Sequence, residues 1–229
     1  MLSTVKSILT KTRGGVELYA TAWLYNVINH LCLAPVVYLV GIKAFATAAP
    51  YSLAARIAYA ITGIGIHGIG YYCTHRAMHT KALWWAHKYH HRFNAFICPI
   101  AASAVTQTEY LFAYMIPFII AGVALNPMPM DTIAISALVI GHVNNLIHTP
   151  WMEELSEKVV PWFGVSTADH FAHHRELTAN YAAPTINIDR LVELSPTVES
   201  AATRLFGSVF GKPYALAQTE GKSSKGKAE

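Results

Sequence analysis

Long apolar segments separated by short polar turns make up the first two thirds of the chain. A helix needs about 20 apolar residues to cross a hydrocarbon layer about 30 Å thick. Four segments reach that length, and we expect membrane spans at Leu18–Phe45, Leu53–Cys73, Ala101–Leu125 and Asp131–Pro150. The pattern therefore predicts an all-α integral membrane protein with a bundle of about four transmembrane helices.

A few polar residues lie inside these predicted spans. Glu109 interrupts the third span, and His142, Asn144 and His148 fall in the second half of the fourth. Such side chains are costly in lipid, so we expect them to face the interior of the bundle or a cavity. For Glu109 two roles stay open, lining a lipid tunnel or pairing with another residue within the bundle.

Composition and charge support a membrane protein and predict its orientation. Hydrophobic residues make up 53% of the chain and charged residues 13%, whereas a soluble domain has about 25% charged residues. Fifteen of the 17 lysines and arginines lie before residue 18, between 73 and 100, or after 150. Because positive loops stay cytosolic, we expect both termini on the cytosolic side. The basic residues form no patch typical of nucleic-acid binding.

The histidines are concentrated in three boxes with recurring spacings. The first has the form H-x-x-x-H, and the second and third both have the form H-x-x-H-H. A four-residue spacing puts two rings on one face of a helix. Neutral imidazole is the commonest metal-binding side chain, so this repetition favours a metal site over packed core histidines. Eight of the 12 histidines belong to the boxes, namely His75, His79, His87, His90, His91, His170, His173 and His174.

Eight imidazoles are too many for one ion, since a closed tetrahedral site takes four ligands. We therefore expect two ions with about four ligands each and open positions, in a cap on the cytosolic side. Imidazole suits zinc, copper, iron and nickel. The chain lacks the H-E-x-x-H motif of zincins and the Glu-x-x-His pairs of soluble di-iron bundles. A nitrogen-rich dinuclear site at a membrane surface best fits activation of O2 against a lipid C–H bond.

The first two boxes and their surroundings read Tyr72-x-x-His75-Arg76-x-x-His79-x-x-x-Leu83-Trp84-x-x-His87-Lys88-x-His90-His91. The third reads His170-x-x-His173-His174 and is followed by Asn180-Tyr181. Together these segments resemble the fatty acid hydroxylase/sterol desaturase superfamily of histidine-box enzymes. The resemblance implies a membrane-bound non-haem di-iron oxidoreductase that uses O2 and two electrons to hydroxylate, oxidise or desaturate a lipid in lipid biosynthesis.

The resemblance also implies roles for individual residues. The eight box histidines would bind iron, and either His148 or His142 would supply the extra ligand that the family places before the last box. Asp169 either fixes an imidazole tautomer or caps the helix of the third box. No catalytic residue is implied beyond the ligands. Candidates for supporting the ligands or lining the tunnel are His142, Asn144, Glu109, Asp169 and Asn180.

Within the family, the segment from His91 to Phe96 is distantly similar to the sterol C4-methyl oxidase branch. Ala95-Phe96 and Thr106-Gln107 stand where that branch has a proline and a His-Pro pair, so both sterols and fatty-acyl lipids remain candidate substrates. The chain has no His-Pro-Gly-Gly haem motif, and electrons would come from a separate b-type cytochrome or reductase.

Two other classes of protein fit the histidines less well. One is a zinc-dependent membrane hydrolase, which iron content and O2 consumption would distinguish from an oxygenase. The other is a haem-binding membrane electron carrier, which a Soret band would reveal.

The ends of the chain complete the predicted organisation. We expect a cytosolic N-terminal segment over residues 1–17, a membrane-embedded catalytic domain over 18–212 and a flexible basic tail over 213–229. The last five residues, Lys225-Gly226-Lys227-Ala228-Glu229, resemble the K-x-K-x-x retrieval signal of the endoplasmic reticulum. We therefore expect that membrane in a eukaryotic cell and the inner membrane in a bacterium.

Overall fold

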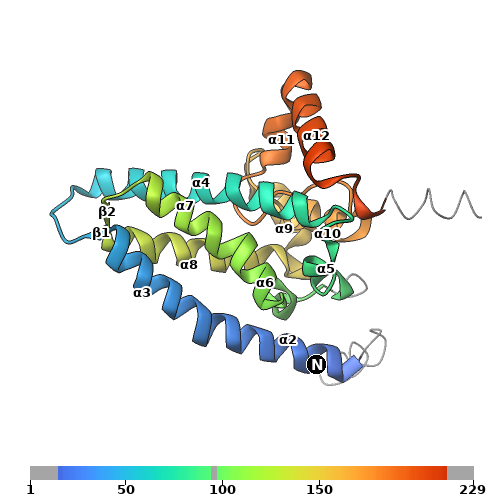
Figure 1. Ribbon diagram of the computed structural model, residues 1–229, viewed down its shortest axis with the longest axis horizontal. Helices are drawn as coiled ribbons and strands as arrows, with labels where there is room; N and C mark the ends of the chain where they lie inside the picture. Colours follow the sequence, from blue (N-terminus) through green and yellow to red (C-terminus); the bar gives the residue numbers. More distant parts are fainter. Residues whose placement is uncertain (1–14, 94–96, 216–229) are drawn as a thin grey trace, which may run out of the picture.

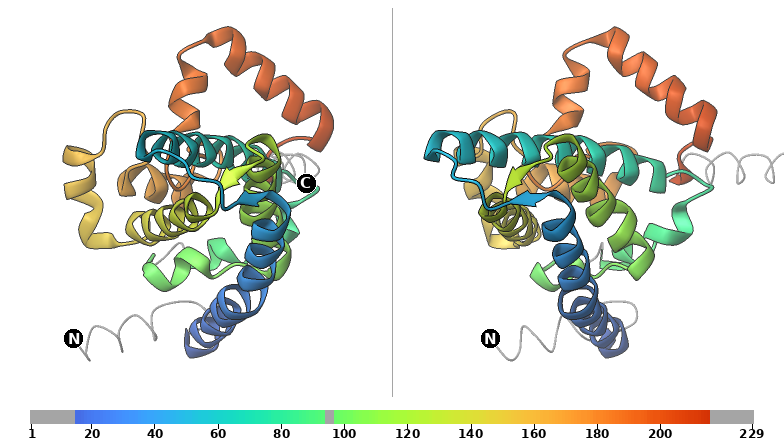
Figure 2. Two further views of the ribbon diagram at one scale, coloured as in Figure 1. Left: turned by 90° about the vertical axis from the view of Figure 1, so that its left-hand side faces the viewer. Right: turned by 60° about the vertical axis from the view of Figure 1, so that its left-hand side comes forward.

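The computed structural model describes residues 15–93 and 97–215 (Figure 1). Four helical segments are long and apolar enough to cross a membrane, and they pack against one another into a bundle (Figures 1 and 2). This confirms the predicted all-α membrane architecture. The segments are Gly15–Phe45, Leu53–Met78, Gln107–Ala124 and Met130–Ile147.

Two of the four segments change helix type along their length. The first consists of α2 (Gly15–Val27), the π-helix η1 (Ile28–Leu33) and α3 (Ala34–Phe45). The third consists of α6 (Gln107–Glu109), the π-helix η4 (Tyr110–Met115) and α7 (Ile116–Ala124). Each π-helix directly precedes a turn with a proline, Pro35 or Pro117. Proline clashes with the carbonyl four residues before it, and a wider turn relieves that clash.

The third segment begins later than the sequence pattern predicts. The expected span starts at Ala101, yet Pro99–Ser103 form a short 3-10 helix, η3, and the spanning helix begins only at Gln107. Thr106 precedes it and its side chain accepts a hydrogen bond from the backbone N–H of Glu109. This cap fixes the start of the helix, and apolar composition alone gave no sign of it.

The end of the bundle away from the histidines is closed by two short contacts. β1 (Ala46–Thr47) and β2 (Met128–Pro129) pair in parallel, which joins the turn after the first span to the turn after the third. Beside them Arg56 of α4 (Leu53–Met78) donates to Asp131 of α8 (Met130–Ile147) over 2.5 Å. Together they connect all four spans at this end.

The opposite end carries the polar cap, and both the start of α2 and the last described segment lie on that side (Figure 1). The cap packs on the ends of α4 and α8. Its elements are α5 (Trp84–His87), η2 (His90–Phe93), η3, η5 (Pro150–Met152), α9 (Glu153–Val159), α10 (Thr167–Glu176), α11 (Ile188–Glu193) and α12 (Pro196–Phe210). Pro213 and Tyr214, at the start of the expected tail, contact the cap: Pro213 bridges to Thr80, and Tyr214 N–H donates to the His79 carbonyl over 2.7 Å.

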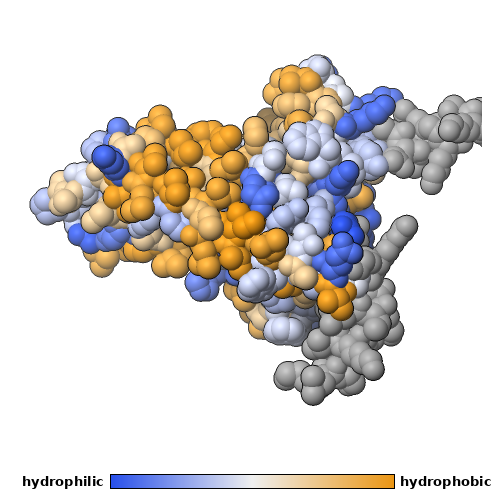
Figure 3. All heavy atoms as spheres, turned by 60° about the horizontal axis from the view of Figure 1, so that its bottom comes forward, coloured by the Kyte–Doolittle hydropathy of each residue, from blue (hydrophilic) through white to orange (hydrophobic). Residues whose placement is uncertain are grey.

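The outside of the bundle is apolar and its ends are polar. Figure 3 shows hydrophobic residues gathered over the spanning helices, with hydrophilic residues at the cap and at the far turns. Leu31, Leu39 and Ile61 are among the large side chains that point outward. A water-soluble protein rarely exposes so continuous an apolar surface, and this band has the position that lipid tails would cover.

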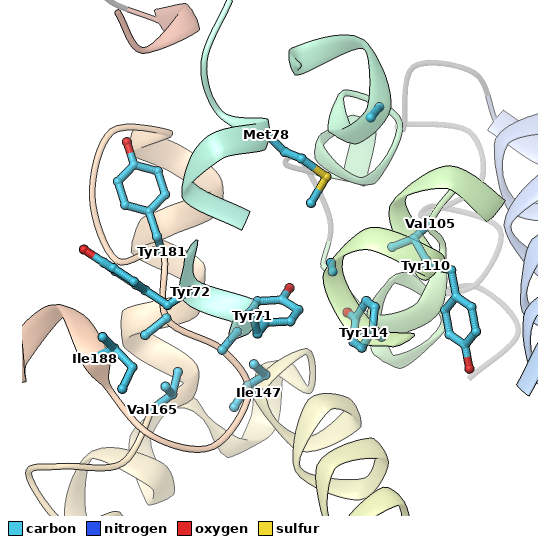
Figure 4. Close-up of a cluster of buried hydrophobic side chains, with 14 residues drawn as sticks. Tyr71, Tyr72, Met78, Val105, Tyr110, Tyr114, Ile147, Val165, Tyr181 and Ile188 are labelled. Atoms are coloured by element: carbon cyan, nitrogen blue, oxygen red, sulfur yellow. The ribbon is translucent and has the colours of Figure 1, made fainter. Parts of the chain in front are cut away.

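The main buried cluster lies between α4, η4, α8 and the chain after α10 (Figure 4). Tyr71 of α4 and Tyr114 of η4 face each other there, with ring centroids 5.2 Å apart. Tyr71 also lies 5.1 Å from the ring of His75. The hydrophobic core is therefore continuous with the histidine-bearing end of α4.

Gly70 lies where α4 and α7 approach each other closely, so a substitution at this position tests how near the two helices are. A Cβ at this position would lie 2.9 Å from Pro117 Cβ and 3.2 Å from Pro117 Cα. We expect Gly70→Ala to destabilise the protein by about 1–3 kcal/mol through overpacking, measured as a lower Tm in detergent. The control is Gly141→Ala, because nothing lies within 4 Å of that Cβ. Equal Tm values for the two variants would show that the helices do not approach this closely.

Candidate metal centre

The long helix α4 brings the first box to the end of the bundle. Its 26 residues correspond to about 39 Å, longer than a hydrocarbon core of about 30 Å. Ser52 caps its start by accepting from the Ala55 N–H. The last turns carry His75 and lead to His79, so both rings lie where the helix leaves the apolar layer.

The third box lies on α10, whose two ends are both fixed. At its start the Ser166 side chain accepts from the Asp169 N–H, and the Asp169 carboxylate accepts from the Ser166 N–H. This reciprocal capping box satisfies two backbone donors that the helix leaves open. At its end Leu177 adopts a left-handed conformation. Helix α10 thereby holds His170, His173 and His174 in a fixed orientation.

The structure brings nine histidines together in two adjoining groups. In each group, one ring nitrogen per residue lies within 4.8 Å of all the others. The groups touch, since the rings of His91 and His174 are 4.7 Å apart. The first group is His75, His79, His87, His91 and His173, and the second is His90, His148, His170 and His174.

All nine rings are buried, and burial keeps them uncharged. Removal from water lowers the pKa of His173 and of His148 to about 4. The same burial, followed by repulsion from neighbouring imidazoles, lowers the pKa of His91 and His174 well below 6.5. Near pH 7 each ring is therefore neutral and offers a nitrogen lone pair, the form that binds metals.

In the first group, hydrogen bonds decide which nitrogen has the lone pair. His75 Nδ1 lies 2.6 Å from the Tyr181 carbonyl, and His87 Nδ1 lies 2.6 Å from Glu109 Oε1. Both oxygens accept hydrogen bonds, so both Nδ1 atoms carry the proton. The Nε2 atoms of these neutral rings are then lone pairs, and they lie 2.9 Å apart. Two lone pairs at that distance repel each other unless a cation lies between them.

The second group repeats this arrangement. His148 Nδ1 lies 2.7 Å from the Asn144 carbonyl and donates to it. Its Nε2 lone pair faces His170 Nε2 at 2.9 Å, and His170 Nε2 is 3.1 Å from His174 Nε2. Two nitrogens held at 2.0–2.1 Å from one ion, at a right angle, are about 3 Å apart. The spacing of the nitrogens therefore fits one metal ion in each group.

Several ring nitrogens are left without a hydrogen-bond partner. They include His173 Nε2, whose ring is already oriented by a 2.8 Å bond from Nδ1 to the Ala179 carbonyl. A buried unpaired polar atom costs about 1–3 kcal/mol. A metal ion bound to His173 Nε2 would remove that cost. The unpaired nitrogen therefore supports a metal site independently of the nitrogen spacing.

Glu109 contacts His87, a partner that the sequence did not identify. Its carboxylate is buried and holds the His87 ring, 22 residues away in the chain. Of the two roles considered for Glu109, the structure shows a pairing contact, with His87. The useful signal in the sequence was that Glu109 is the only acidic residue between 18 and 130, since a lone acid in an apolar segment requires a partner.

Asp169 lies at the start of α10 and contacts no imidazole in the described residues. Besides the capping box, it accepts from Arg190 over 2.9 Å and 3.1 Å. Of the two roles considered for Asp169, the structure shows the capping contact and, within the described part of the chain, no contact with an imidazole, and the N-cap residue itself is Ser166. Glu109 takes the role that the sequence suggested for Asp169.

Asn144 and Asn180 act on the histidines through the backbone. Asn144 is buried and its side chain donates to the Ala102 carbonyl over 2.8 Å, while its own carbonyl receives His148. Asn180 has a positive φ of 55°, which asparagine tolerates better than most residues. It lies between the Ala179 and Tyr181 carbonyls that bind His173 and His75, so its turn directs both carbonyls inward.

His142 is not part of either group. It is exposed, and its Nδ1 contacts the Leu138 carbonyl of its own helix at 2.7 Å. His148 lies six positions further along the chain, at the C-terminal cap of α8. Of the two candidates for an additional ligand, the structure brings only His148 to the other histidines.

A half-open cavity of ≈ 410 Å³ lies between the spans, near the second histidine group. Its walls are mainly apolar and come from α3, η4, α7 and α8. Tyr110 and Tyr114, both in the π-helix η4, and the buried His67 of α4 also line it. Asn144 belongs to the wall and binds His148 through its carbonyl. One residue therefore connects the cavity to the second group.

The family model described as fatty acid hydroxylase matches residues 60–193. That match covers more than half of the chain and includes both histidine groups. No curated protein and no solved structure gives a significant match.

We expect Glu109→Leu to weaken metal binding about 10- to 100-fold, the usual effect of removing the partner of a histidine ligand. The leucine leaves His87 free to adopt the other tautomer. Glu109→Gln keeps an oxygen that accepts from Nδ1, so it should retain most of the metal. Metal content after dialysis against graded chelator measures both. Equal losses in the two variants would argue that the carboxylate does not act through this hydrogen bond.

Proposed function

The chain belongs to the fatty acid hydroxylase family, and on that premise we propose that it is a membrane-bound di-iron oxidoreductase that uses O2 to hydroxylate, oxidise or desaturate a lipid of the sterol or fatty-acyl type. One observation carries the proposal. Two groups of neutral imidazoles direct lone pairs at two neighbouring points, next to an apolar cavity in a membrane bundle.

In this proposal each histidine group holds one iron ion. His75, His79, His87, His91 and His173 would hold the first, and His90, His148, His170 and His174 the second. When bound, the iron pair supplies activation of O2 against a C–H bond. In a hydroxylation one oxygen atom enters the product and the other becomes water, with two electrons and two protons taken up. The electrons come from a separate b-type cytochrome or reductase.

The protein itself orients the ligands and excludes water. Glu109 and three backbone carbonyls fix the rings of His87, His75, His148 and His173. Trp84 lies over the first group, stacked on His91 with centroids 5.4 Å apart and on Tyr214 at 4.8 Å. The apolar cavity is of the size that binds small lipophilic ligands, about 300–1,000 Å³. A lipid chain in it would lie beside the second group.

The histidine groups also argue against a haem carrier. Within each group the rings converge on one point with nitrogens as close as 2.9 Å, which leaves no plane for a porphyrin between them. A zinc hydrolase would use the same ligands. Iron rather than zinc in the active protein, together with O2 consumption on substrate addition, is the outcome that favours the oxygenase.

We expect His90→Ala and His173→Ala each to lower metal content and to abolish lipid oxidation, because each removes a ligand that no nearby side chain replaces. The control is His142→Ala, which removes an exposed histidine outside both groups and should change neither property. Metal analysis of the purified variants and conversion of lipid extracts under O2 measure the two effects. Full activity of either ligand variant would remove that residue from the site.

The orientation in the membrane follows from the lysine and arginine distribution. We propose that both termini and the cap face the cytosol, in the endoplasmic reticulum of a eukaryote or the inner membrane of a bacterium. A protease-cleavable tag at Ala48 should be shielded from cytosolic protease and one at Ser223 should be cut, and imaging of the tagged protein checks its location. Cleavage at both sites would contradict the orientation. Ser223 and the retrieval signal at Lys225 and Lys227 lie outside the described residues.

A further inference from the structure

The apolar side chains of the helix α12 (Pro196–Phe210) are largely uncovered by the rest of the protein. None of its residues is buried, and Val198, Leu205 and Val209 expose 50%, 61% and 61% of their surface. An isolated helix of this length is marginal in water and depends on a surface that covers its apolar side. It also lies outside the residues 60–193 that match the family model.

The apolar and polar residues of α12 lie on opposite sides. With 100° of rotation per residue, Val198, Ala202, Leu205 and Val209 fall within about 60° of the helix circumference. Phe206 and Phe210 widen this apolar side toward α4, where Phe206 packs on Tyr72. Ser200 and Arg204 fall on the opposite side. An apolar side opposite a polar side is the pattern of helices that lie in the plane of a membrane surface.

The direction of α12 fits such a position. In Figure 1 the spanning helices run horizontally, whereas α12 stands across them at the end that carries the cap. The left view of Figure 2, which looks along the bundle, shows α12 extended sideways from α4. A helix that crosses the spans at their cap end lies along the plane of the membrane, at the level where α4 leaves it.

A groove of ≈ 430 Å³ lies between α12 and α4, beside the contact of Phe206 with Tyr72. Leu205 and Val209 form one wall, Cys73 and Met78 of α4 form the other, and Phe112 of the third span also lines it. Cys73 and Phe112 are exposed on the outside of their helices. The groove is thus continuous with the apolar surface of two spans, which lipid tails cover when the bundle is in a membrane.

From these observations we propose that α12 lies on the membrane surface and that the groove between α12 and α4 binds an acyl chain of a surrounding phospholipid. The apolar side of α12 then leaves water, and Ser200 and Arg204 stay at the headgroup level. The proposal depends on the membrane bundle but not on the identity of the metal or the reaction.

Site-specific fluorescence on the full chain tests the proposal without any turnover. Cys32, Cys73 and Cys98 are replaced by Ala, and single cysteines are introduced as Leu205→Cys, Val209→Cys and, as the matched control on the opposite side, Ser200→Cys. Each is labelled with the polarity-sensitive dye NBD and placed in phosphatidylcholine nanodiscs, with or without phosphatidylcholine that carries a nitroxide at carbon 5 of its acyl chain. Unchanged Tm values show that the variants fold.

We expect blue-shifted emission at positions 205 and 209 and at least a twofold loss of intensity with nitroxide lipid. The label at position 200 should emit as in water and be quenched by aqueous iodide instead. Water-like emission at all three positions would overturn the proposal. Blue-shifted emission at 205 and 209 without nitroxide quenching would also overturn it, because the groove would then be covered by protein, either a second copy or a partner.

Discussion

Burying nine imidazole rings beside one another costs free energy wherever a ring nitrogen has no partner. An unpaired buried nitrogen costs about 1–3 kcal/mol, and two lone pairs that face each other add repulsion. In this protein one nitrogen of His75, His87, His148 and His173 donates to an oxygen of the chain. In each group one nitrogen per ring lies within 4.8 Å of the others, which is where a metal ion would satisfy several of them at once.

The elements around the histidines are arranged to provide those oxygens. Backbone carbonyls are available where a helix ends or the chain turns sharply, because regular helices use their own carbonyls. Ala179 and Tyr181 flank Asn180, whose positive φ turns the chain after α10. The carbonyl of Asn144 is in the last turn of α8. The irregular segments of the cap therefore serve to orient the ligands, whereas the regular helices set their height relative to the membrane.

Sequence patterns predicted the parts of this structure that depend on local spacing. The four spans follow from apolar length, and the boxes place pairs such as His75 and His79 on one side of a helix. Contacts between distant segments were harder to predict. Glu109 reaches His87 across the loop after η2, and the acid that looks adjacent to a box, Asp169, points to Arg190 instead. Closeness in sequence to a histidine says little about which ring an acid contacts, because neighbours on a helix point in different directions.

The difference between His148 and His142 also depends on contacts between distant segments. Both follow the apolar part of α8, and neither spacing nor composition distinguishes them. The helix ends at Ile147, so His148 lies where α8 meets the cap, whereas His142 is still on the outer surface. Asn144, between them, points its side chain inward to the cavity and donates to Ala102 of η3. Its carbonyl at the same time receives His148. The last turn of α8 therefore both lines the cavity, through the Asn144 side chain, and orients His148, through the Asn144 carbonyl.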